Sequence, residues 1–281
     1  MKYTRKSLND QKSQNDQDEQ DEGIRINKYL SEAGICSRRE ADRLIQEGKI
    51  IIDGHLAVIG EKVFPHSKIE IDGKPVVLED ELVYIVFNKP SGVVCTTDRK
   101  VYRNIIDAIG YPKRIFPVGR LDKMSTGLIL LTNDGEIVNK ILRAGNYHEK
   151  EYIVTVDKPV DERFIGNMSG GIPLLNTITR KCIVKMEDTY KFRIILTQGL
   201  NRQIRRMCEY LGYDVINLER VRIMNISLGK LQSGKWRNLT PKELSQLNRL
   251  VKDSKKTAIG SNEAIGGAEA SAVDRDGGFY E

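Results

Sequence analysis

The central part of the chain, residues 81–252, has more strand-like than helix-like segments, and this balance limits its possible folds. The strand-like segments are ELVYIVFNKPSGVVCTT, GLILLTNDG, EYIVTVDKP, RKCIVKM and YKFRIILTQG. The helical patterns are GEIVNKILRAG, DERFIGNMSGG and NRQIRRMCEYLG. Because helices and strands do not alternate strictly, the sequence predicts an α+β domain around a largely antiparallel, mixed sheet.

Residues 23–80 have the pattern of a smaller, separate unit. A short helix is predicted in RINKYLSEAG and a second one in SRREADRLIQEG. The second helix begins with a capping box, in which Ser37 is the N-cap and Glu40 lies three residues later. Two β-hairpins follow, each around an Asp-Gly turn, in KIIIDGHLAV and KIEIDGKPV.

Three arginines, Arg38, Arg39 and Arg43, cluster on the second predicted helix. Charges on one helix face are usually just solvated, and the near-zero net charge of this unit agrees with that reading. Their grouping on one short element instead favours contact with RNA. The stretch INKYLSEAGICSRREADRLIQEGKIIIDG resembles the RNA-binding module named after the fourth protein of the small ribosomal subunit, which implies binding of structured RNA without catalysis.

The two ends of the chain differ from these units in composition. Residues 1–22 are rich in Asn, Gln and Asp, and residues 253–281 are rich in Gly and Ala, so neither end can bury much apolar surface. We therefore expect a disordered tail at 1–22, an RNA-binding module at 23–80, a main domain at 81–252 and a disordered tail at 253–281.

Composition excludes several classes of protein. No apolar run approaches the length of a membrane span, and the N-terminus has no apolar signal core. The four cysteines and three histidines are scattered, which argues against a zinc site and a disulfide framework. We expect a cytoplasmic protein with no bound metal and no association with a membrane.

Positive charge is concentrated in the main domain. Residues 81–252 carry 29 basic and 17 acidic side chains, a net charge of +12, whereas the whole chain carries +6. A basic folded domain between acidic ends is compatible with nucleic-acid binding, although many basic proteins bind none.

A carboxylate stands between two cations in the segment VGRLDKMSTGLILLTNDG. Asp122 lies between Arg120 and Lys123, just before the apolar run LILL. A surface ion pair is one explanation and contributes only ~0–1 kcal/mol. The other is a catalytic acid that neighbouring cations keep ionised.

Two further segments carry side chains of the same kinds of chemistry. Tyr152 follows Lys150 at the start of a predicted strand, and Arg202, Arg205 and Arg206 open a predicted helix. A tyrosine at a strand start is more often a packing residue, and arginines at a helix start are usually solvated or bind phosphate. Each feature is weak by itself.

Together and in this order, the three segments resemble the RsuA family of pseudouridine synthases. The resemblance is carried by FPVGRLDKMSTGLILLTNDG, LRAGNYHEKEYIVTV and QGLNRQIRRMCEYLGYDVINLERVRIMNISL, and it spans about residues 23–250. It implies that Asp122 is the catalytic carboxylate, that Tyr152 packs on the target base and is a candidate general base, and that Arg205 pairs with the aspartate. Arg202 and Arg206 are implied less strongly, as phosphate ligands, and Lys150 as an RNA contact.

The resemblance also implies the reaction and the partner. The expected activity is conversion of uridine to pseudouridine in large-subunit (23S) ribosomal RNA, by a monomeric enzyme. This isomerisation adds and removes no atom and transfers no electron, so no cofactor is expected, and the sequence has no P-loop and no G-x-G-x-x-G after a strand.

Two alternatives belong to other classes. An RNA-binding assembly factor with a degenerate synthase domain would be free to lose the Asp122, Tyr152 and Arg205 set, which is intact here. An RNA methyltransferase would need a glycine-rich cofactor loop after the first strand of the main domain, where this chain reads FNKPSGVVCTT.

Overall fold

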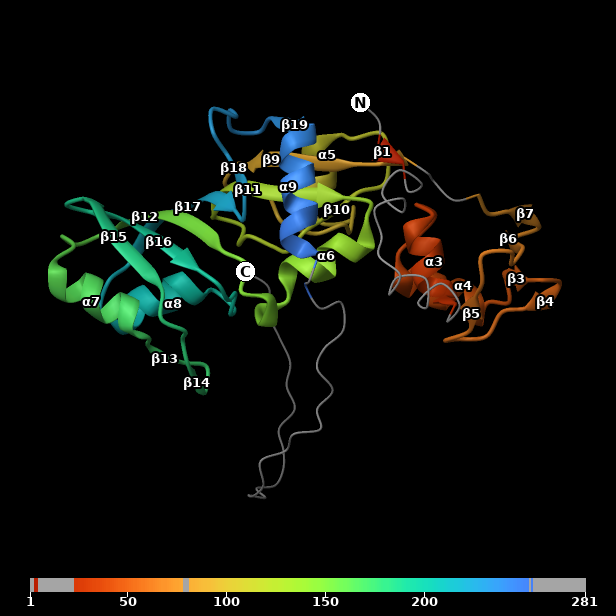
Figure 1. The fold of residues 1–281 in the computed structure, drawn as a ribbon, viewed down its shortest axis with the longest axis horizontal. Helices are drawn as coiled ribbons and strands as arrows, with labels where there is room; N and C mark the ends of the chain where they lie inside the picture. The colour runs from red at the N-terminus through yellow and green to blue at the C-terminus, as the bar shows by residue number, and fades with distance from the viewer. Residues whose placement is uncertain (1–2, 5–22, 78–80, 253, 255–281) are drawn as a thin grey trace, which may run out of the picture.

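The structure, a computed structural model, describes residues 3–4, 23–77, 81–252 and 254. The predicted α+β class is confirmed: helices lie against mixed but largely antiparallel sheets (Figure 1). Most residues of the two expected tails lie outside the described residues. Of the N-terminal tail, Tyr3–Thr4 forms strand β1, which pairs with β8 (Glu81–Leu82).

The N-terminal unit consists of two helices and two small sheets. The helices are α3 (Ile26–Glu32) and α4 (Arg38–Gln46). The four-stranded sheet has the order β4-β3-β6-β7, and β2 pairs with β5 in the other sheet. These strands are β2 (Ile24–Arg25), β3 (Ile50–Ile52), β4 (His55–Leu56), β5 (Lys62–Val63), β6 (Ile69–Ile71) and β7 (Lys74–Pro75).

Both Asp-Gly turns form the predicted hairpins. Asp53 and Gly54 have φ of 48° and 89°, and Asp72 and Gly73 have φ of 48° and 72°. A two-residue turn with positive φ at both positions matches the twist of the strands that it joins.

The predicted capping box of α4 is only half formed. Ser37 Oγ accepts a hydrogen bond from the Glu40 backbone N–H at 3.1 Å. The Glu40 carboxylate accepts from Arg43 at 2.5 Å and is therefore engaged with the helix surface.

The main domain is built on one nine-stranded sheet of order β15-β16-β12-β17-β11-β9-β19, with β10 beside β11 and β18 beside β17. All its strand pairs are antiparallel except β11 with β17. The strands are β9 (Tyr84–Lys89), β10 (Phe116–Pro117), β11 (Thr126–Thr132), β12 (Lys150–Val156), β15 (Ile183–Asp188), β16 (Lys191–Leu196), β17 (Val215–Ile223), β18 (Ile226–Ser227) and β19 (Trp236–Asn238).

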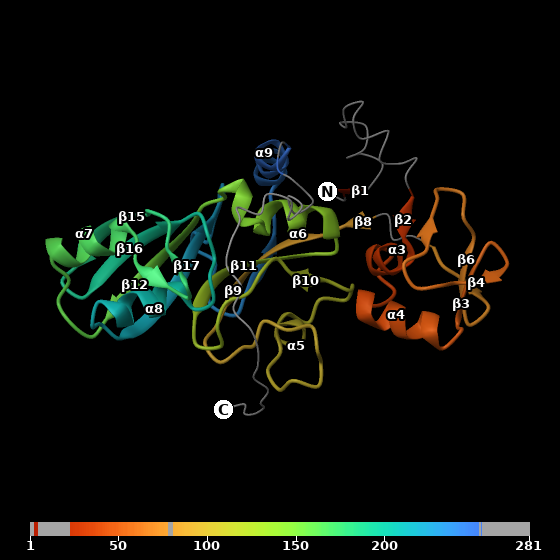
Figure 2. The same cartoon turned by 90° about the horizontal axis from the view of Figure 1, so that it is seen from below.

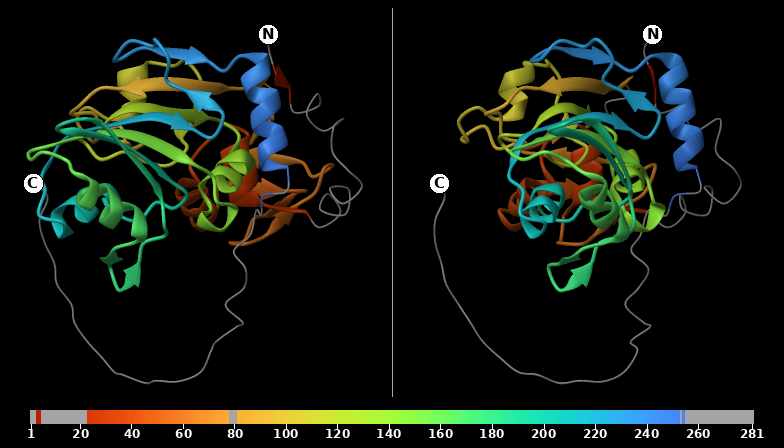
Figure 3. Two further views of the ribbon diagram at one scale, coloured as in Figure 1. Left: turned by 60° about the vertical axis from the view of Figure 1, so that its left-hand side comes forward. Right: turned by 90° about the vertical axis from the view of Figure 1, so that its left-hand side faces the viewer.

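Helices cover both faces of this sheet. They are α5 (Ile105–Ile109), α6 (Gly135–Leu142), the 3₁₀ turn η2 (Ala144–Asn146), α7 (Glu162–Gly170), α8 (Gln203–Tyr210) and α9 (Pro241–Val251). Helices α6 and α9 lie on the opposite face of β9 and β11 from α5 (Figure 2). A small hairpin of β13 (Pro173–Leu174) and β14 (Thr177–Ile178) projects from the α7 end (Figure 3).

Alternation along the buried strands explains this arrangement. In β11, Leu128 and Leu130 pack toward α6 and α9, whereas Ile129 and Leu131 pack toward α5. Successive side chains of a strand point to opposite faces, so an all-apolar strand such as LILL needs cover on both sides. A third cluster joins α7 and α8 to β12 and β16.

The N-terminal unit contacts the main domain at the α6 end. Arg114 donates from Nη1 to the backbone carbonyl of Ser31 at 3.0 Å, and Lys28 Nζ lies 4.0 Å from a Glu136 carboxylate oxygen. The two units therefore lie side by side, with the N-terminal unit away from the α7 end (Figure 1).

Candidate active site

The loop that carries Asp122 is anchored on both sides. Leu121 is buried, and its backbone N–H donates to Cys95 Sγ at 3.4 Å. Ser125 N–H donates to the Asp122 carbonyl at 3.1 Å, which closes a turn just before β11. The Asp122 side chain is 34% exposed, so it is held at the edge of the core but open to a substrate.

Two arginines from the start of α8 face this carboxylate. Arg205 Nε lies 3.7 Å from Asp122 Oδ2, and Arg202 Nη1 lies 3.9 Å from the same oxygen. The expected pairing of Arg205 with Asp122 is therefore present. It is looser than a charge-assisted hydrogen bond of about 2.7–2.9 Å, as catalytic contacts often are before substrate binds.

The remaining contacts of Arg205 fix its position. Nη1 donates to the Val215 carbonyl at 3.0 Å, and Nη2 donates to Ser125 Oγ at 3.5 Å. Burial, and then Arg202, lower the pKa of Arg205. Arg202 itself has a left-handed backbone (φ 48°) as the N-cap of α8, a strained conformation of the kind found at functional sites.

Tyr152 is half-buried in β12 where two hydrophobic clusters meet. Its Cα is paired with that of Arg220 in β17, and the Arg220 guanidinium carbon lies 6.0 Å from the centre of the tyrosine ring. Tyr152 therefore packs against the cluster that joins α7 and α8 to β12 and β16, and also against the cluster between α5 and strands β9 and β11.

Arg220 is a buried residue that the sequence patterns did not single out. It is 3% exposed, and its Nε donates to the Leu128 carbonyl at 2.7 Å. Its strand is in register with Gly127 of β11, where an added Cβ would lie 2.3 Å from the Arg220 carbonyl oxygen. Gly127 therefore permits the close approach of β17 to β11.

Lys89 is a second buried cation that sequence reasoning missed. Its Nζ donates to the carbonyls of Pro90, Lys123 and Ser125 at 2.7–3.0 Å. Burial lowers the pKa of Lys89, against the opposing effect of Cys95 and Asp122. These bonds tie the end of β9 to the turn after Asp122.

Lys150 lies in a less open position than an RNA contact would suggest. It is half-buried, and its Nζ donates to the His148 carbonyl at 3.4 Å. Burial, and then the charge of Arg220, lower the pKa of Lys150 to about 8.

The other predicted RNA ligands are distributed over two surfaces. Arg38, Arg39 and Arg43 are exposed on α4, but Arg43 pairs with Glu40 at 2.5 Å and with Glu47 at 3.5 Å. Arg206 is half-buried on α8 and donates to Asn201 at 3.3 Å. The RNA-binding roles of all these residues stay predictions.

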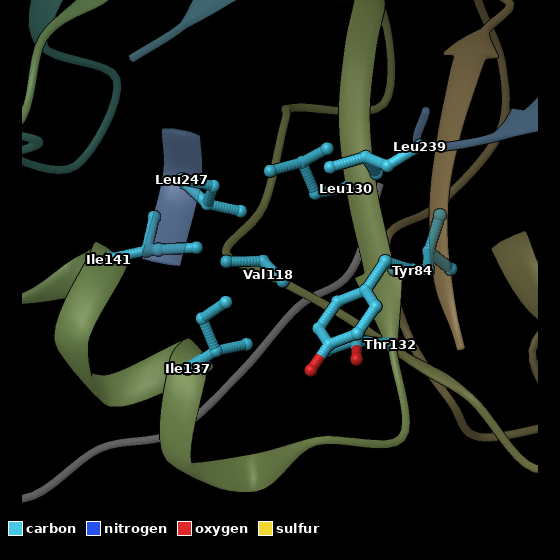
Figure 4. Close-up of a pocket in the computed structure, with 9 residues that line it drawn as sticks. Tyr84, Val118, Leu130, Thr132, Ile137, Ile141, Leu239 and Leu247 are labelled. Carbon is cyan, nitrogen blue, oxygen red and sulfur yellow. The ribbon is translucent and has the colours of Figure 1, made fainter. Parts of the chain in front are cut away.

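An apolar cavity elsewhere in the domain is part of the core. Its walls include Val118, Leu130, Ile141 and Leu247, between α6, α9 and the sheet (Figure 4). Asp122 does not line it. Within the described ranges there is no group of three His, Cys, Asp or Glu residues that could hold a metal ion, and no helix suited to crossing a membrane.

The family models for RNA pseudouridylate synthase and for the S4 domain match residues 83–210 and 24–63. The chain is also 56% identical to the dual-specificity RNA pseudouridine synthase RluF of Escherichia coli, over 83% of this chain and 81% of that protein. The chain belongs to the RNA pseudouridine synthases. The expected RsuA-type identity is thereby confirmed, with its likeness to RluF.

Two further relatives of this pseudouridine synthase agree. Ribosomal large subunit pseudouridine synthase B of Bacillus subtilis is 35% identical over 82% of this chain and 98% of its own length. A crystal structure of a pseudouridylate synthase covers 80% of this chain and 99% of its own, with 29% identity and a TM-score of 0.60. The synthase is thus an isomerase with an S4 module at its N-terminal side.

Proposed function

We propose that this synthase converts one or more uridines of large-subunit (23S) ribosomal RNA to pseudouridine, with Asp122 as the carboxylate that acts on the sugar. The observation that carries the proposal is the position of Asp122. Its side chain is 34% exposed, and its Oδ2 lies 3.7 Å from Arg205 Nε and 3.9 Å from Arg202 Nη1. The large subunit is suggested by the name of the Bacillus subtilis relative.

The chemistry requires few groups. The bond from sugar C1′ to uracil N1 breaks, a bond from C1′ to C5 forms, and a hydrogen passes from C5 to N1, so substrate and product have the same atoms. Asp122 acts either as nucleophile at C1′ or as the base that assists a glycal intermediate. Arg205 and Arg202 place positive charges 3.7 Å and 3.9 Å from its carboxylate oxygen Oδ2.

Tyr152 supplies an aromatic surface for the base once the uridine leaves its stack. It packs against the hydrophobic cluster that contains Leu121, the residue before Asp122, and this position supports the role. The S4 module contributes exposed cations on α4, through which it would bind structured RNA. We further expect a monomer that acts in the cytoplasm without a cofactor.

The substrate is tested by incubating the purified protein separately with large-subunit and small-subunit ribosomal RNA that lack modifications, and by mapping pseudouridine in each. We expect pseudouridine at one or a few positions of the large-subunit RNA. Modification confined to small-subunit RNA would reject the proposed substrate. Tight binding without pseudouridine in either RNA would instead favour an assembly factor.

A further inference from the structure

Several half-buried arginines of the main domain lie beside carboxylates. Arg193 pairs with Glu151 and Glu187, Arg222 pairs with Glu149 and Glu151, and Arg237 pairs with Glu243. These pairs satisfy charges that are partly removed from water, which would otherwise be costly to bury.

The two cations beside Tyr152 have no carboxylate partner of this kind within the described ranges. Among the residues that the structure describes, neither Arg220 nor Lys150 lies within ion-pair distance of a carboxylate. Arg220 Nη2 is buried without a hydrogen-bond partner in the described structure. A buried cation without a counter-charge is unfavourable in the free protein and calls for an explanation.

The two cations share one place in the sheet. Lys150 lies two residues before Tyr152, and therefore on the same face of β12. Arg220 is the cross-strand partner of Tyr152, and its charge acts on Lys150. Lys89 adds a further positive charge, buried at the Asp122 loop.

We propose that Arg220 and Lys150 stabilise the negative charge that uracil carries once its bond to the sugar has broken. The inference rests on the proposed function, because it requires the base to lie against Tyr152. When the C1′–N1 bond breaks, its electron pair stays on N1, so neutral uridine becomes a uracil anion beside an electron-poor sugar. The charge disappears again when C5 bonds to C1′ and the C5 hydrogen is transferred to N1.

Fixed positive charges in a water-poor site are well suited to this step, because they need no reorganisation as the anion forms. A backbone phosphate is a poorer candidate for the same charges. Phosphates remain largely in water and are matched by exposed cations such as Arg120, Lys123 and Arg202. Buried Arg220 and half-buried Lys150 are therefore assigned to the base.

The first test separates reaction rate from RNA binding. Because uridine is neutral before the bond breaks, Arg220→Met and Lys150→Met should lower the single-turnover rate by on the order of 10²-fold while RNA affinity changes little. Arg220→Lys and Lys150→Arg should each recover part of the rate. Arg193→Met, on the neighbouring strand, is the matched control: it should lower thermal stability and leave the rate of the folded enzyme unchanged.

The second test uses pH. Lys150 loses its charge as pH rises through about 8, because burial and the charge of Arg220 in β17 lower its pKa. Lys150 in turn lowers the pKa of its neighbour His148. Its closest cross-strand partners in β16 and β17 are the uncharged Leu196 and Ile223. The wild-type rate should fall about tenfold from pH 7 to pH 9, and the fall should be smaller in Lys150→Arg. Titration of the RNA itself affects the wild type and Lys150→Arg equally, so it does not contribute to the difference between them.

Other results would overturn the inference. Equal losses of rate and of RNA affinity in the two methionine variants would identify the cations as phosphate ligands. Normal rates in folded Lys150→Met, or a loss of its stability that accounts for its lower activity, would also reject it. Wild-type protein that forms no pseudouridine would reject the proposed function instead, so the two failures are distinguishable.

Discussion

Gly127 is the residue through which the two halves of the sheet meet, and its replacement by alanine should be severely destabilising. The parallel pairing of β11 with β17 involves only Thr126 with Glu219 and Gly127 with Arg220. Gly127 has a φ of 95°, and an added Cβ would lie 2.3 Å from the carbonyl oxygen and 2.8 Å from the nitrogen of Arg220.

The magnitude follows from two separate costs. A left-handed backbone costs a non-glycine residue roughly 1–2 kcal/mol. Relieving the overlap requires the strands to separate by about 1 Å, and overpacking of this kind costs roughly 1–3 kcal/mol. A total of about 2–5 kcal/mol corresponds to a fall in melting temperature of about 5–15 °C for a domain of this size. Activity should fall as well, because the same pairing positions Arg220 beside Tyr152.

Two other glycines separate these costs. Gly110 has a φ of 62° and open space around it, so Gly110→Ala should show the backbone cost alone. Gly166 lies in α7 with open space and no positive φ, so Gly166→Ala should be neutral or stabilise by about 0.5–1 kcal/mol. Thermal unfolding of all three variants is the assay. Equal melting temperatures for Gly127→Ala and Gly110→Ala would refute the close approach of β11 and β17.

Three shorter predictions follow from other contacts. Arg205→Lys should lower turnover at least tenfold in a single-turnover assay, since lysine lacks the guanidinium that reaches Asp122, Ser125 and the Val215 carbonyl together; unchanged turnover would remove Arg205 from the site. Replacing the exposed Arg38 and Arg39 by alanine should weaken RNA binding. The slope of log affinity against log salt concentration should become shallower by ~0.7 per lost phosphate contact on a single strand, and an unchanged slope in a binding titration would show that α4 does not touch RNA. Thr240→Ala should cost ~1 kcal/mol in urea unfolding because it removes the capping box of α9, whereas a loss below ~0.3 kcal/mol would show that the cap is not needed.

Local patterns were sufficient for most of the fold. The Asp-Gly hairpins, the α4 N-cap and the buried strand LILL depend on neighbouring residues, and they form as predicted. Helix α9 was missed although its signals are local: Thr240 and Glu243 form a capping box, and a proline stands in the first turn.

Strand β17 could not be recognised from periodicity. Its segment VINLERVRI places Arg220, a charged residue, at a buried position, which breaks the apolar alternation that identifies a strand. Arg220 is buried because β11 and β12 flank its strand, and this pairing is a property of the assembled sheet.

The site was predicted in part, for the same reason. The pairing of Asp122 with Arg205 followed from a resemblance of motifs and is present. Lys89 escaped notice because its partners are backbone carbonyls of Lys123 and Ser125, more than thirty residues later in the chain. Backbone acceptors have no sequence signature, so only the fold reveals such contacts.

The central claim is that Asp122 is the catalytic carboxylate, and Asp122→Asn tests it most directly. Asparagine keeps the size of the side chain but removes its charge and its nucleophilic oxygen. Purified Asp122→Asn protein is incubated with large-subunit ribosomal RNA, binding is confirmed, and pseudouridine is measured. We predict a fall in turnover on the order of 10⁴-fold or more with RNA binding retained. Bound RNA with near-normal pseudouridine formation would contradict the account and leave Asp122 as a surface ion pair.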